Sequence, residues 1–304
     1  MRLITAAESR PALGMREAIA AVRAAFEQMG QGAGAVLAPG GVGTADSTHS
    51  LSVAGALLPA QGVAGVSVAA GASGAPRHSV LLSALPSGEP LALIEAEVIA
   101  RLAMAATVAV AAKRLARRDA RVLALLGANE AAHLHADALL LAHPLQTVLV
   151  AAERGAPELA ARIATEFGVN ARAVDAAAAV SQADIVVSCA PAREPLFDGS
   201  RLEPGAFVAA VGDAGPETRE LDDAVLARAD LIAVEWLPAA QARAGEFARA
   251  ARGVLESTRI VELGRLLIGA VPYVRRAHDV TVFRGLGVGL AEVALAHLVW
   301  QRVR

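Results

Sequence analysis

The sequence predicts an α/β protein with a doubly wound parallel sheet, on two observations. Through the middle of the chain, short apolar runs alternate with helical segments, which is the pattern of a parallel sheet covered by helices. The runs are continuously apolar, as expected of strands buried on both faces. The expected strands are 122–127, 147–152, 171–174, 184–189, 207–212 and 231–235.

The N-terminal third of the chain predicts a different arrangement. Apolar positions at helical spacing favour an amphipathic helix over 11–29. Apolar segments separated by Gly and Pro turns then favour a mixed or antiparallel sheet. Its expected strands are 50–54, 65–69, 79–83 and 91–95, and a long helix over 97–117 follows them.

Four cations mark the end of this long helix: Lys113, Arg114, Arg117 and Arg118. Cations stabilise a helix C-terminus through the helix dipole, so we interpret the cluster as a solvated helix end in preference to a binding site. Further along, 280–283 predicts another strand. A glycine-rich turn, which suits either a ligand contact or a tight connection, and a final apolar helix to Arg304 complete the chain.

Composition excludes several classes of protein. The chain has 304 residues, 55% of them hydrophobic, which suits about two domains and favours a large oligomer interface. Its net charge of −2 and pI of about 6.4 predict no role with nucleic acid. The longest apolar run has about 11 residues, whereas a membrane helix needs about 20, so no membrane role is expected. A single cysteine and an N-terminus without the apolar core of a signal peptide favour the cytoplasm.

An apolar strand runs into a tight turn at Gly127 and then into an alanine-rich helix. The amino end of such a helix directs N–H groups and a partly positive dipole at an anion, so the pyrophosphate of a dinucleotide fits there. Of the fingerprint G-x-G-x-x-G only the first glycine is present, because Asn129 and Ala132 occupy the next two positions. Asn129 tolerates the left-handed backbone that glycine would supply. Alternatively, Gly127 only ends a core strand.

The residues after the other strands extend this prediction. Ligands of doubly wound sheets bind beyond the carboxyl ends of the strands, so the loops at Gly127, Glu153, Cys189 and Gly212 should face one crevice. In this position Glu153 would bond a ribose 2′-OH and favour NAD, whereas Arg154 would meet a 2′-phosphate and favour NADP. Both alternatives remain open from the residues alone.

Six segments carry a resemblance. They are 111–116 (AAKRLA), 183–190 (ADIVVSCA), 202–205 (LEPG), 211–212 (VG), 219–222 (RELD) and 280–283 (VTVF). In their order and spacing they resemble the ornithine cyclodeaminase/mu-crystallin family across nearly the whole chain.

The resemblance implies a Rossmann-type domain over 119–274 that binds NAD or NADP. It also implies a second, α+β substrate or dimerisation domain, formed by 1–118 and 275–304, and a homodimer. Family members exchange a hydride at a carbon that bears nitrogen, and the cofactor carries the difficult step. We therefore expect an ornithine cyclodeaminase-like lyase or an NAD(P)-dependent oxidoreductase, imine reductase-like or alanine dehydrogenase-like, that acts on a small amino or imino acid.

Cofactor contacts are expected in the loops after the strands, mostly through the backbone. The residues are Gly127, Ala128, Asn129, Glu130, Ala131, Glu153, Arg154, Cys189, Ala190, Val211, Gly212 and Gly285. Cys189 is interpreted as a small strand-end residue and not as a nucleophile.

The expected substrate-binding cations are replaced. Ser67 stands where the family has a lysine, Ala103 where it has an arginine, and Gly40 where it has another arginine. An amino-acid substrate needs a fixed cation for its carboxylate. Arg77 and His78, together with His49, are candidate replacements in the first domain, although the alternative is that they are surface residues.

The acid/base position is also changed. The family's aspartate corresponds to Ala214, and Asp213 lies one residue before it, so Asp213 is the candidate catalytic residue. No metal site is expected, because His133 and His135 fall on different faces of a helix. The alternative function is a non-catalytic NAD(P)-binding or ligand-binding family member. A third is a structural dimer without a ligand.

Overall fold

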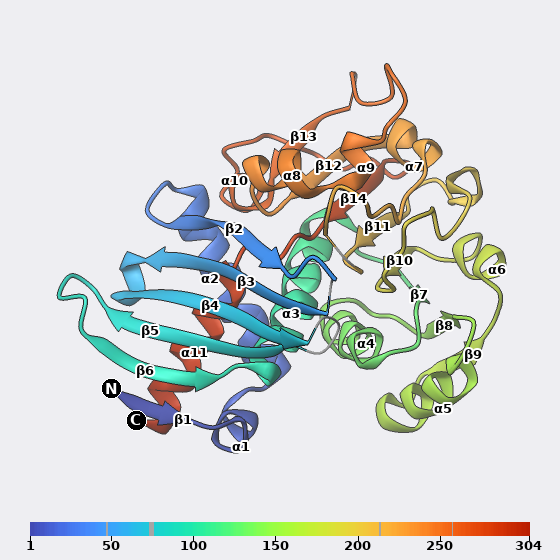
Figure 1. The fold of residues 1–304 in the computed structure, drawn as a ribbon. Helices are drawn as coiled ribbons and strands as arrows, with labels where there is room; N and C mark the ends of the chain where they lie inside the picture. The colour runs from blue at the N-terminus through green and yellow to red at the C-terminus, as the bar shows by residue number, and fades with distance from the viewer. Residues whose placement is uncertain (47, 73–75, 213, 257) are drawn as a thin grey trace. The chain divides into compact units, whose positions relative to one another are not determined.

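The computed structural model describes residues 1–46, 48–72, 76–212, 214–256 and 258–304 (Figure 1). It divides into two compact units. Met1–Thr107 and Gly287–Arg304 form the first, which we call the mixed-sheet unit. Val108–Leu286 forms the second, which we call the parallel-sheet unit.

The mixed-sheet unit contains a six-stranded sheet in the order β1-β6-β5-β4-β3-β2. Its edge strand β1 runs parallel to β6, and the other neighbours pair antiparallel. The strands are β1 (Arg2–Ile4), β2 (Ala35–Gly43), β3 (His49–Leu58), β4 (Val63–Ala72), β5 (Arg77–Ala84) and β6 (Pro90–Glu95). The structure thus selects the mixed sheet from the two expected alternatives.

Two helices of this unit lie behind the sheet in Figure 1, α2 (Met15–Gly30) and α11 (Leu290–Val303). Gly65 of β4 brings α11 close to the sheet, because a Cβ on this residue would lie 2.9 Å from Cγ2 of Val293. A short helix, α1 (Ala6–Ser9), follows β1. The long helix α3 (Glu97–Leu115) begins in this unit and continues into the next.

The parallel-sheet unit contains eight strands in the order β13-β12-β14-β11-β10-β7-β8-β9, and all neighbours pair parallel. The first five along the chain are β7 (Val122–Leu126), β8 (Thr147–Ala151), β9 (Asn170–Ala173), β10 (Ile185–Ser188) and β11 (Phe207–Ala210). The last three are β12 (Ala229–Val234), β13 (Ile260–Glu262) and β14 (Val280–Arg284). Every residue of β10, β11 and β14 is buried. This is expected of the apolar residues in strands covered on both faces, whereas the burial of Arg284 at the end of β14 is not.

Helices connect these strands. They are α4 (Glu130–Ala142), α5 (Ala156–Phe167), α6 (Ala176–Val180), α7 (Asp223–Arg228), α8 (Leu237–Arg243), α9 (Gly245–Ala248) and α10 (Leu263–Leu267). From β7 the chain builds the sheet outward through β8 and β9, and then returns to place β10 on the other side of β7. The strand order therefore reverses between β7 and β10, which is the switch point where doubly wound sheets bind ligands.

The predicted α/β class with a parallel sheet is confirmed, and so are its six expected strands within one or two residues at most ends. Three strands were not predicted: β1 and β13 have three residues each, and β2 contains Pro39 and three glycines. β14 pairs between β11 and β12 in the parallel sheet, although the expected boundary after residue 274 groups it with the N-terminal half. Among the described residues, the helices are all too short or too polar to cross a membrane.

Candidate cofactor site at the carboxyl edge of the parallel sheet

A cavity of about 710 Å³ lies beyond the carboxyl ends of the parallel strands, and we call it the carboxyl-edge cavity. The loops after β7, β8, β9 and β10 line it. Its residues are Leu126, Gly127, Ala128, Asn129, Ala151, Ala152, Glu153, Arg154, Val174, Asp175, Ala176, Ala190, Pro191 and Leu196. Because β7 and β10 flank the switch point, the cavity occupies the position where this class of sheet holds a nucleotide.

Gly127 makes the turn from β7 into α4. Its φ of 134° lies in a region that side chains rarely adopt, and a Cβ here would lie 3.2 Å from Sγ of Cys189 and 3.4 Å from Cβ of Ala190. The turn therefore requires glycine for two reasons: other residues rarely adopt this backbone conformation, and a side chain would have little room. This explains why the first glycine of the fingerprint is kept.

Asn129 takes a different role from the one expected of it. Its φ of −121° and ψ of 178° are extended, so Asn129 does not adopt the left-handed backbone conformation that glycine would supply. The residue is instead the N-cap of α4: its Oδ1 accepts a hydrogen bond from Ala132 N at 2.9 Å. Its Nδ2 donates to Cys189 O at 3.1 Å, which ties the start of α4 to the end of β10.

Both ribose candidates reach the cavity. Glu153 and Arg154 follow β8, both are exposed, and both line the carboxyl-edge cavity. In the described parts of the chain, neither side chain has a hydrogen bond or ion pair. Each is therefore available to a ligand, and the alternative of NAD or NADP stays open.

Cys189 is unsuited to nucleophilic chemistry. Burial, and then the nearby charge of Glu220, raise the pKa of its thiol to about 12. The reactive form of cysteine is the thiolate, which is scarce at neutral pH when the pKa is so high. The interpretation of Cys189 as a small strand-end residue agrees with this environment.

Gly212, after β11, lies against the end of β10. A Cβ on Gly212 would come within 2.2 Å of Ala190 O, so this contact needs glycine. Its backbone N–H donates to both carboxylate oxygens of Glu220, each at 3.0 Å, and Ser188 Oγ donates to the same carboxylate at 2.5 Å. One buried carboxylate therefore ties the ends of β10 and β11 together.

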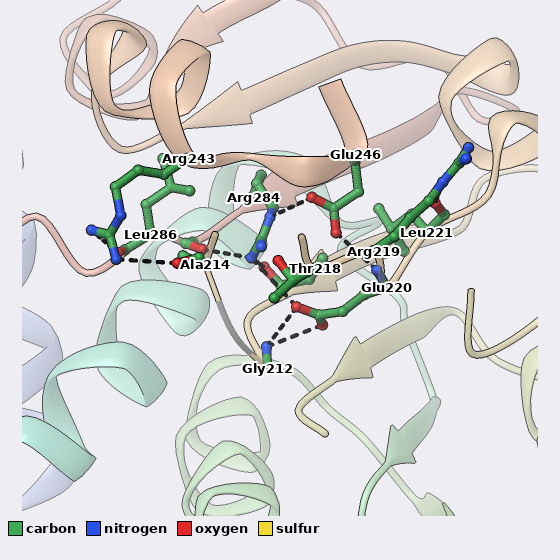
Figure 2. A network of polar contacts seen from close by, with 12 residues as sticks. Gly212, Ala214, Thr218, Arg219, Glu220, Leu221, Arg243, Glu246, Arg284 and Leu286 are labelled. Atoms are coloured by element: carbon green, nitrogen blue, oxygen red, sulfur yellow. Dashed lines mark hydrogen bonds and ion pairs between the residues drawn. The ribbon is translucent and has the colours of Figure 1, made fainter. Parts of the chain in front are cut away.

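Figure 2 shows a buried ionic network around this carboxylate. Arg284 donates from Nε to Glu246 Oε2 at 3.0 Å, and its Nη1 lies 3.5 Å from Glu220 Oε1. The Glu220 backbone N–H in turn donates to Glu246 Oε1 at 3.0 Å. All three side chains are at most 1% exposed. The network joins β14, α9 and the segment before α7, and Glu220 links it to Gly212 at the end of β11.

The structure brings some expected residues together and leaves others apart. Gly127, Ala128, Asn129, Glu153, Arg154 and Ala190 line the carboxyl-edge cavity. Glu130, Ala131, Cys189, Val211, Gly212 and Gly285 do not line it, although they belong to the same unit. Gly285 is buried, and its N–H donates to Ala210 O at 3.1 Å, continuing the pairing of β14 with β11.

The remaining candidates lie elsewhere. Asp213 lies outside the described residues. Arg77 and His78 begin β5 in the mixed-sheet unit, where Arg77 is exposed and His78 half-buried. Among the described residues there is no group of three or more His, Cys, Asp or Glu side chains that could hold a metal ion.

Sequence reasoning missed several residues of the site. Val174, Asp175, Ala176 and Leu196 line the cavity without having been singled out. Glu220 and Glu246 were also missed as members of the network. For Glu220 a signal existed, because it lies in the RELD segment that carries the family resemblance.

Three comparisons with known proteins agree. The family model "Ornithine cyclodeaminase/mu-crystallin family" matches residues 4–304. A Delta(1)-pyrroline-2-carboxylate reductase of Bacillus cereus is 31% identical over 228 residues, which are 73% of this chain and 70% of that protein.

Solved structures are similar over the whole chain. One, described as "probable ornithine cyclodeaminase" from Bordetella pertussis Tohama I, has a TM-score of 0.94 and 35% identity, and covers 99% of this chain and 96% of that one. Another, the Thermococcus litoralis Delta(1)-pyrroline-2-carboxylate reductase in complex with NADH and L-proline, has a TM-score of 0.93 and 23% identity, with coverage of 99% and 97%. The resemblance first seen in six sequence segments is thereby confirmed: the chain belongs to the ornithine cyclodeaminase/mu-crystallin family.

Proposed function

We propose that the protein is an NAD(P)-dependent enzyme that acts on the C–N bond of a small amino or imino acid. The carboxyl-edge cavity carries this proposal, because it lies at the switch point of a parallel sheet, where such sheets bind nucleotides. Two relatives support the reaction class: one is named as a reductase of Delta(1)-pyrroline-2-carboxylate, and another is in complex with NADH and L-proline.

The residues of the cavity fit a dinucleotide. In this proposal the turn at Gly127 and the amino end of α4, capped by Asn129, receive the pyrophosphate. Glu153 receives the ribose hydroxyls of NAD, or Arg154 the 2′-phosphate of NADP. When bound, the nicotinamide supplies or accepts the hydride. The chain itself binds and orients the cofactor.

We further propose the parallel-sheet unit as the cofactor domain and the mixed-sheet unit as the substrate and dimerisation domain. Asp213 is the proposed acid/base residue, and Arg77 and His78 are the proposed partners of the substrate carboxylate. The need for such partners follows from the replaced cations, because Ser67 and Ala103 are buried and uncharged. The predicted cytoplasmic location stays a prediction.

An apolar stripe supports the proposed homodimer. Leu37, Gly55, Val66, Leu81, Leu93 and Leu3 are successive cross-strand partners, so they share one face of the six-stranded sheet. The four leucines are between 36% and 61% exposed, on the face opposite Gly65 and α11. A continuous apolar stripe of this kind usually marks an interface. Light scattering should show a dimer that Leu81→Asp dissociates, whereas a monomeric wild-type protein would contradict the proposal.

A titration tests the proposed function first. Purified protein is titrated with NAD, NADH, NADP and NADPH, followed by nicotinamide fluorescence or by calorimetry. We expect micromolar binding of at least one form, and its loss in Gly127→Val, in which the side chain fills the turn. Circular dichroism of the variant checks that it still folds. If no form binds the wild-type protein, the proposal fails.

Turnover is the second test. With the preferred reduced cofactor, the protein should reduce a cyclic imino acid such as Delta(1)-pyrroline-2-carboxylate, and Asp213→Asn should slow this reaction without weakening cofactor binding. The absence of charge at Ser67 and Ala103 favours one other candidate, a family member that binds NAD(P) or another ligand without catalysis. Cofactor binding without hydride transfer to any imine or from any amino acid would support that candidate.

A further inference from the structure

A second cavity, of about 920 Å³, lies at the opposite edge of the parallel sheet, and we call it the basic cavity. Three segments line it: the end of α3 with the loop before β7, the turn before β11, and the loop before β14. All three precede strands, so the basic cavity is at the amino edge. The proposed cofactor site at the carboxyl edge does not include it.

Positive charge dominates this cavity. Its lining contains six permanent cations, Lys113, Arg114, Arg117, Arg118, Arg275 and Arg276, together with His278, against the two carboxylates Asp119 and Glu203. The whole protein, in contrast, has a net charge of −2. Positive charge is therefore concentrated at this cavity although the protein as a whole is slightly negative. An anion-binding site requires such a local excess of positive charge.

Most of these cations have no anionic partner. Among the described residues, Arg117 is the one of these six cations that forms ion pairs with carboxylates, at 2.9 Å to Asp119 and 3.2 Å to Asp184. Within the described part of the chain, the side chains of Lys113, Arg118 and Arg276 make no hydrogen bond or ion pair, and all three are exposed. Their charges are free to meet a ligand.

The other two arginines form a fixed wall. Arg275 donates to the backbone carbonyls of Leu115, Gly205 and Asp279, and burial lowers its pKa. Arg114 donates to Tyr273 O at 2.6 Å. Both side chains are thus held by neutral carbonyl groups, which orient the guanidinium without neutralising it. The wall is preorganised and keeps its positive charge.

The segments of the wall also approach closely. Gly205 has a φ of 86°, and a Cβ there would lie 2.4 Å from Ala277 O. The turn before β11 is therefore locked against the loop before β14. A rigid scaffold of this kind lowers the entropy cost of binding a ligand.

A helix end does not account for this arrangement. The dipole of α3 contributes roughly half a negative charge at its C-terminus, far less than six cations. Arg275 and Arg276 also come from a segment remote from α3 in sequence. The interpretation of the basic cluster as a solvated helix end therefore covers only part of what the structure assembles.

We propose that the basic cavity binds a polyvalent anion with a phosphate chain, either a free polyphosphate or the triphosphate group of a nucleotide. Arginine suits phosphate oxygens because its planar fork donates two hydrogen bonds at once. The wall of Arg114 and Arg275 would receive one end of the chain, and the exposed Lys113, Arg118 and Arg276 would close over the remainder. The volume lies within the usual range of small-ligand sites, roughly 300–1,000 Å³.

Calorimetric titration of the full-length protein with sodium tripolyphosphate, at constant ionic strength, tests the proposal. The double variant Arg118→Glu/Arg276→Glu should weaken binding by at least a hundredfold, or roughly tenfold for each cation removed, because a hydrogen bond to a charged group contributes at least about one power of ten to affinity. The matched control is Arg16→Glu/Arg252→Glu. It changes the net charge equally at exposed arginines outside the cavity and should leave the affinity unchanged.

Further titrations distinguish a free polyphosphate from a nucleotide as the ligand, and binding at the basic cavity from binding at the carboxyl-edge cavity. Equal affinity for tripolyphosphate and ATP would mean that only the phosphate chain is bound, and tighter binding of ATP would mean that a nucleotide is the ligand; both support the proposal. Binding should persist in Gly127→Val, which makes it independent of the cofactor proposal. Absence of binding to wild-type protein, equal weakening in the control pair, or sulfate binding as tightly as tripolyphosphate would overturn it.

Discussion

Arg284 donates from Nε to Glu246 Oε2 at 3.0 Å, and both side chains are about 1% exposed. The same guanidinium lies 3.5 Å from Glu220, whose carboxylate binds the backbone of Gly212. A charge buried so deeply loses its hydration, so it is tolerated only while its partners stay in place. The ends of β10, β11 and β14 therefore depend on one cation.

Arg284→Met removes that cation and keeps much of its volume. We expect it to lower the free energy of unfolding by about 3–5 kcal/mol, because two buried carboxylates then lack their shared counter-ion. Urea denaturation followed by circular dichroism measures the change. Arg252→Met, at an exposed arginine without a partner among the described residues, should shift the free energy by less than about 0.5 kcal/mol. Equal stability of the two variants would contradict the inferred role of Arg284.

Gly212→Ala tests the contact between the ends of β10 and β11. A Cβ at 2.2 Å from Ala190 O cannot be accommodated without moving one strand end. We expect a loss of about 1–3 kcal/mol in stability, as for overpacked cores, and weaker binding of the proposed cofactor, because Ala190 lines the carboxyl-edge cavity. Gly40→Ala is the matched control, since a Cβ there has nothing within 4 Å. Similar melting temperatures for both variants would argue against the contact.

Buried histidine predicts a loss of stability in mild acid. Burial lowers the pKa of His135 from 6.5 to about 4. Below pH 6.5 the unfolded chain therefore binds a proton that the folded chain excludes, so stability falls as the pH decreases toward 4. We expect protonation of this one residue in the unfolded chain to lower the free energy of unfolding by about 2 kcal/mol between pH 7 and pH 5.

Urea denaturation at the two pH values measures that effect. His135→Leu should reduce the loss of unfolding free energy between pH 7 and pH 5, because its side chain carries no group that binds a proton. His143 contributes in the same direction, because burial also lowers its pKa to about 4. If the free energy of unfolding of His135→Leu depends on pH as in the wild type, His135 is protonated as easily in the folded chain as in the unfolded chain.

Two single variants separate the cofactor alternatives, given that a nicotinamide cofactor binds. Glu153→Ala should weaken binding of NADH by about tenfold and leave NADPH unaffected, because a hydrogen bond to a charged group is lost. Arg154→Ala should weaken the binding of NADPH and leave the binding of NADH unaffected, because the contact with the 2′-phosphate is lost. Fluorescence titration measures both affinities. If neither variant changes the ratio of the two affinities, the ribose lies elsewhere.

Local pattern predicted the parallel sheet well, because strands buried on both faces are recognisable from their composition alone. The run that became β7, 122–126, needed no knowledge of its neighbours. The short strand β13 could not be predicted in this way: its three residues pair only because β12 presents an edge. β2 was missed because glycine and proline argue against a strand unless a neighbouring strand supplies hydrogen bonds.

The site was less predictable for a similar reason. Gly127 could be identified because a tight turn needs glycine whatever surrounds it. The role of Asn129 depends on the carbonyl of Cys189, 60 residues away. Nothing in the sequence marks Arg284 as buried, and only the fold places Glu220 and Glu246 beside it. Long-range polar contacts are the part of a site that a single sequence does not reveal.

The position of β14 has a consequence for synthesis of the protein. β14 lies between β11 and β12, yet it is the last strand of the sheet to be made. A ribosome releases the chain from its N-terminus at about 5–20 residues per second. Between the synthesis of β12 and that of β14, the edges of β11 and β12 that will later pair with β14 are unpaired. Unpaired strand edges associate readily with other chains. The nascent protein therefore needs protection until its final residues emerge, and a message truncated before residue 280 would yield an aggregating product instead of a smaller folded protein.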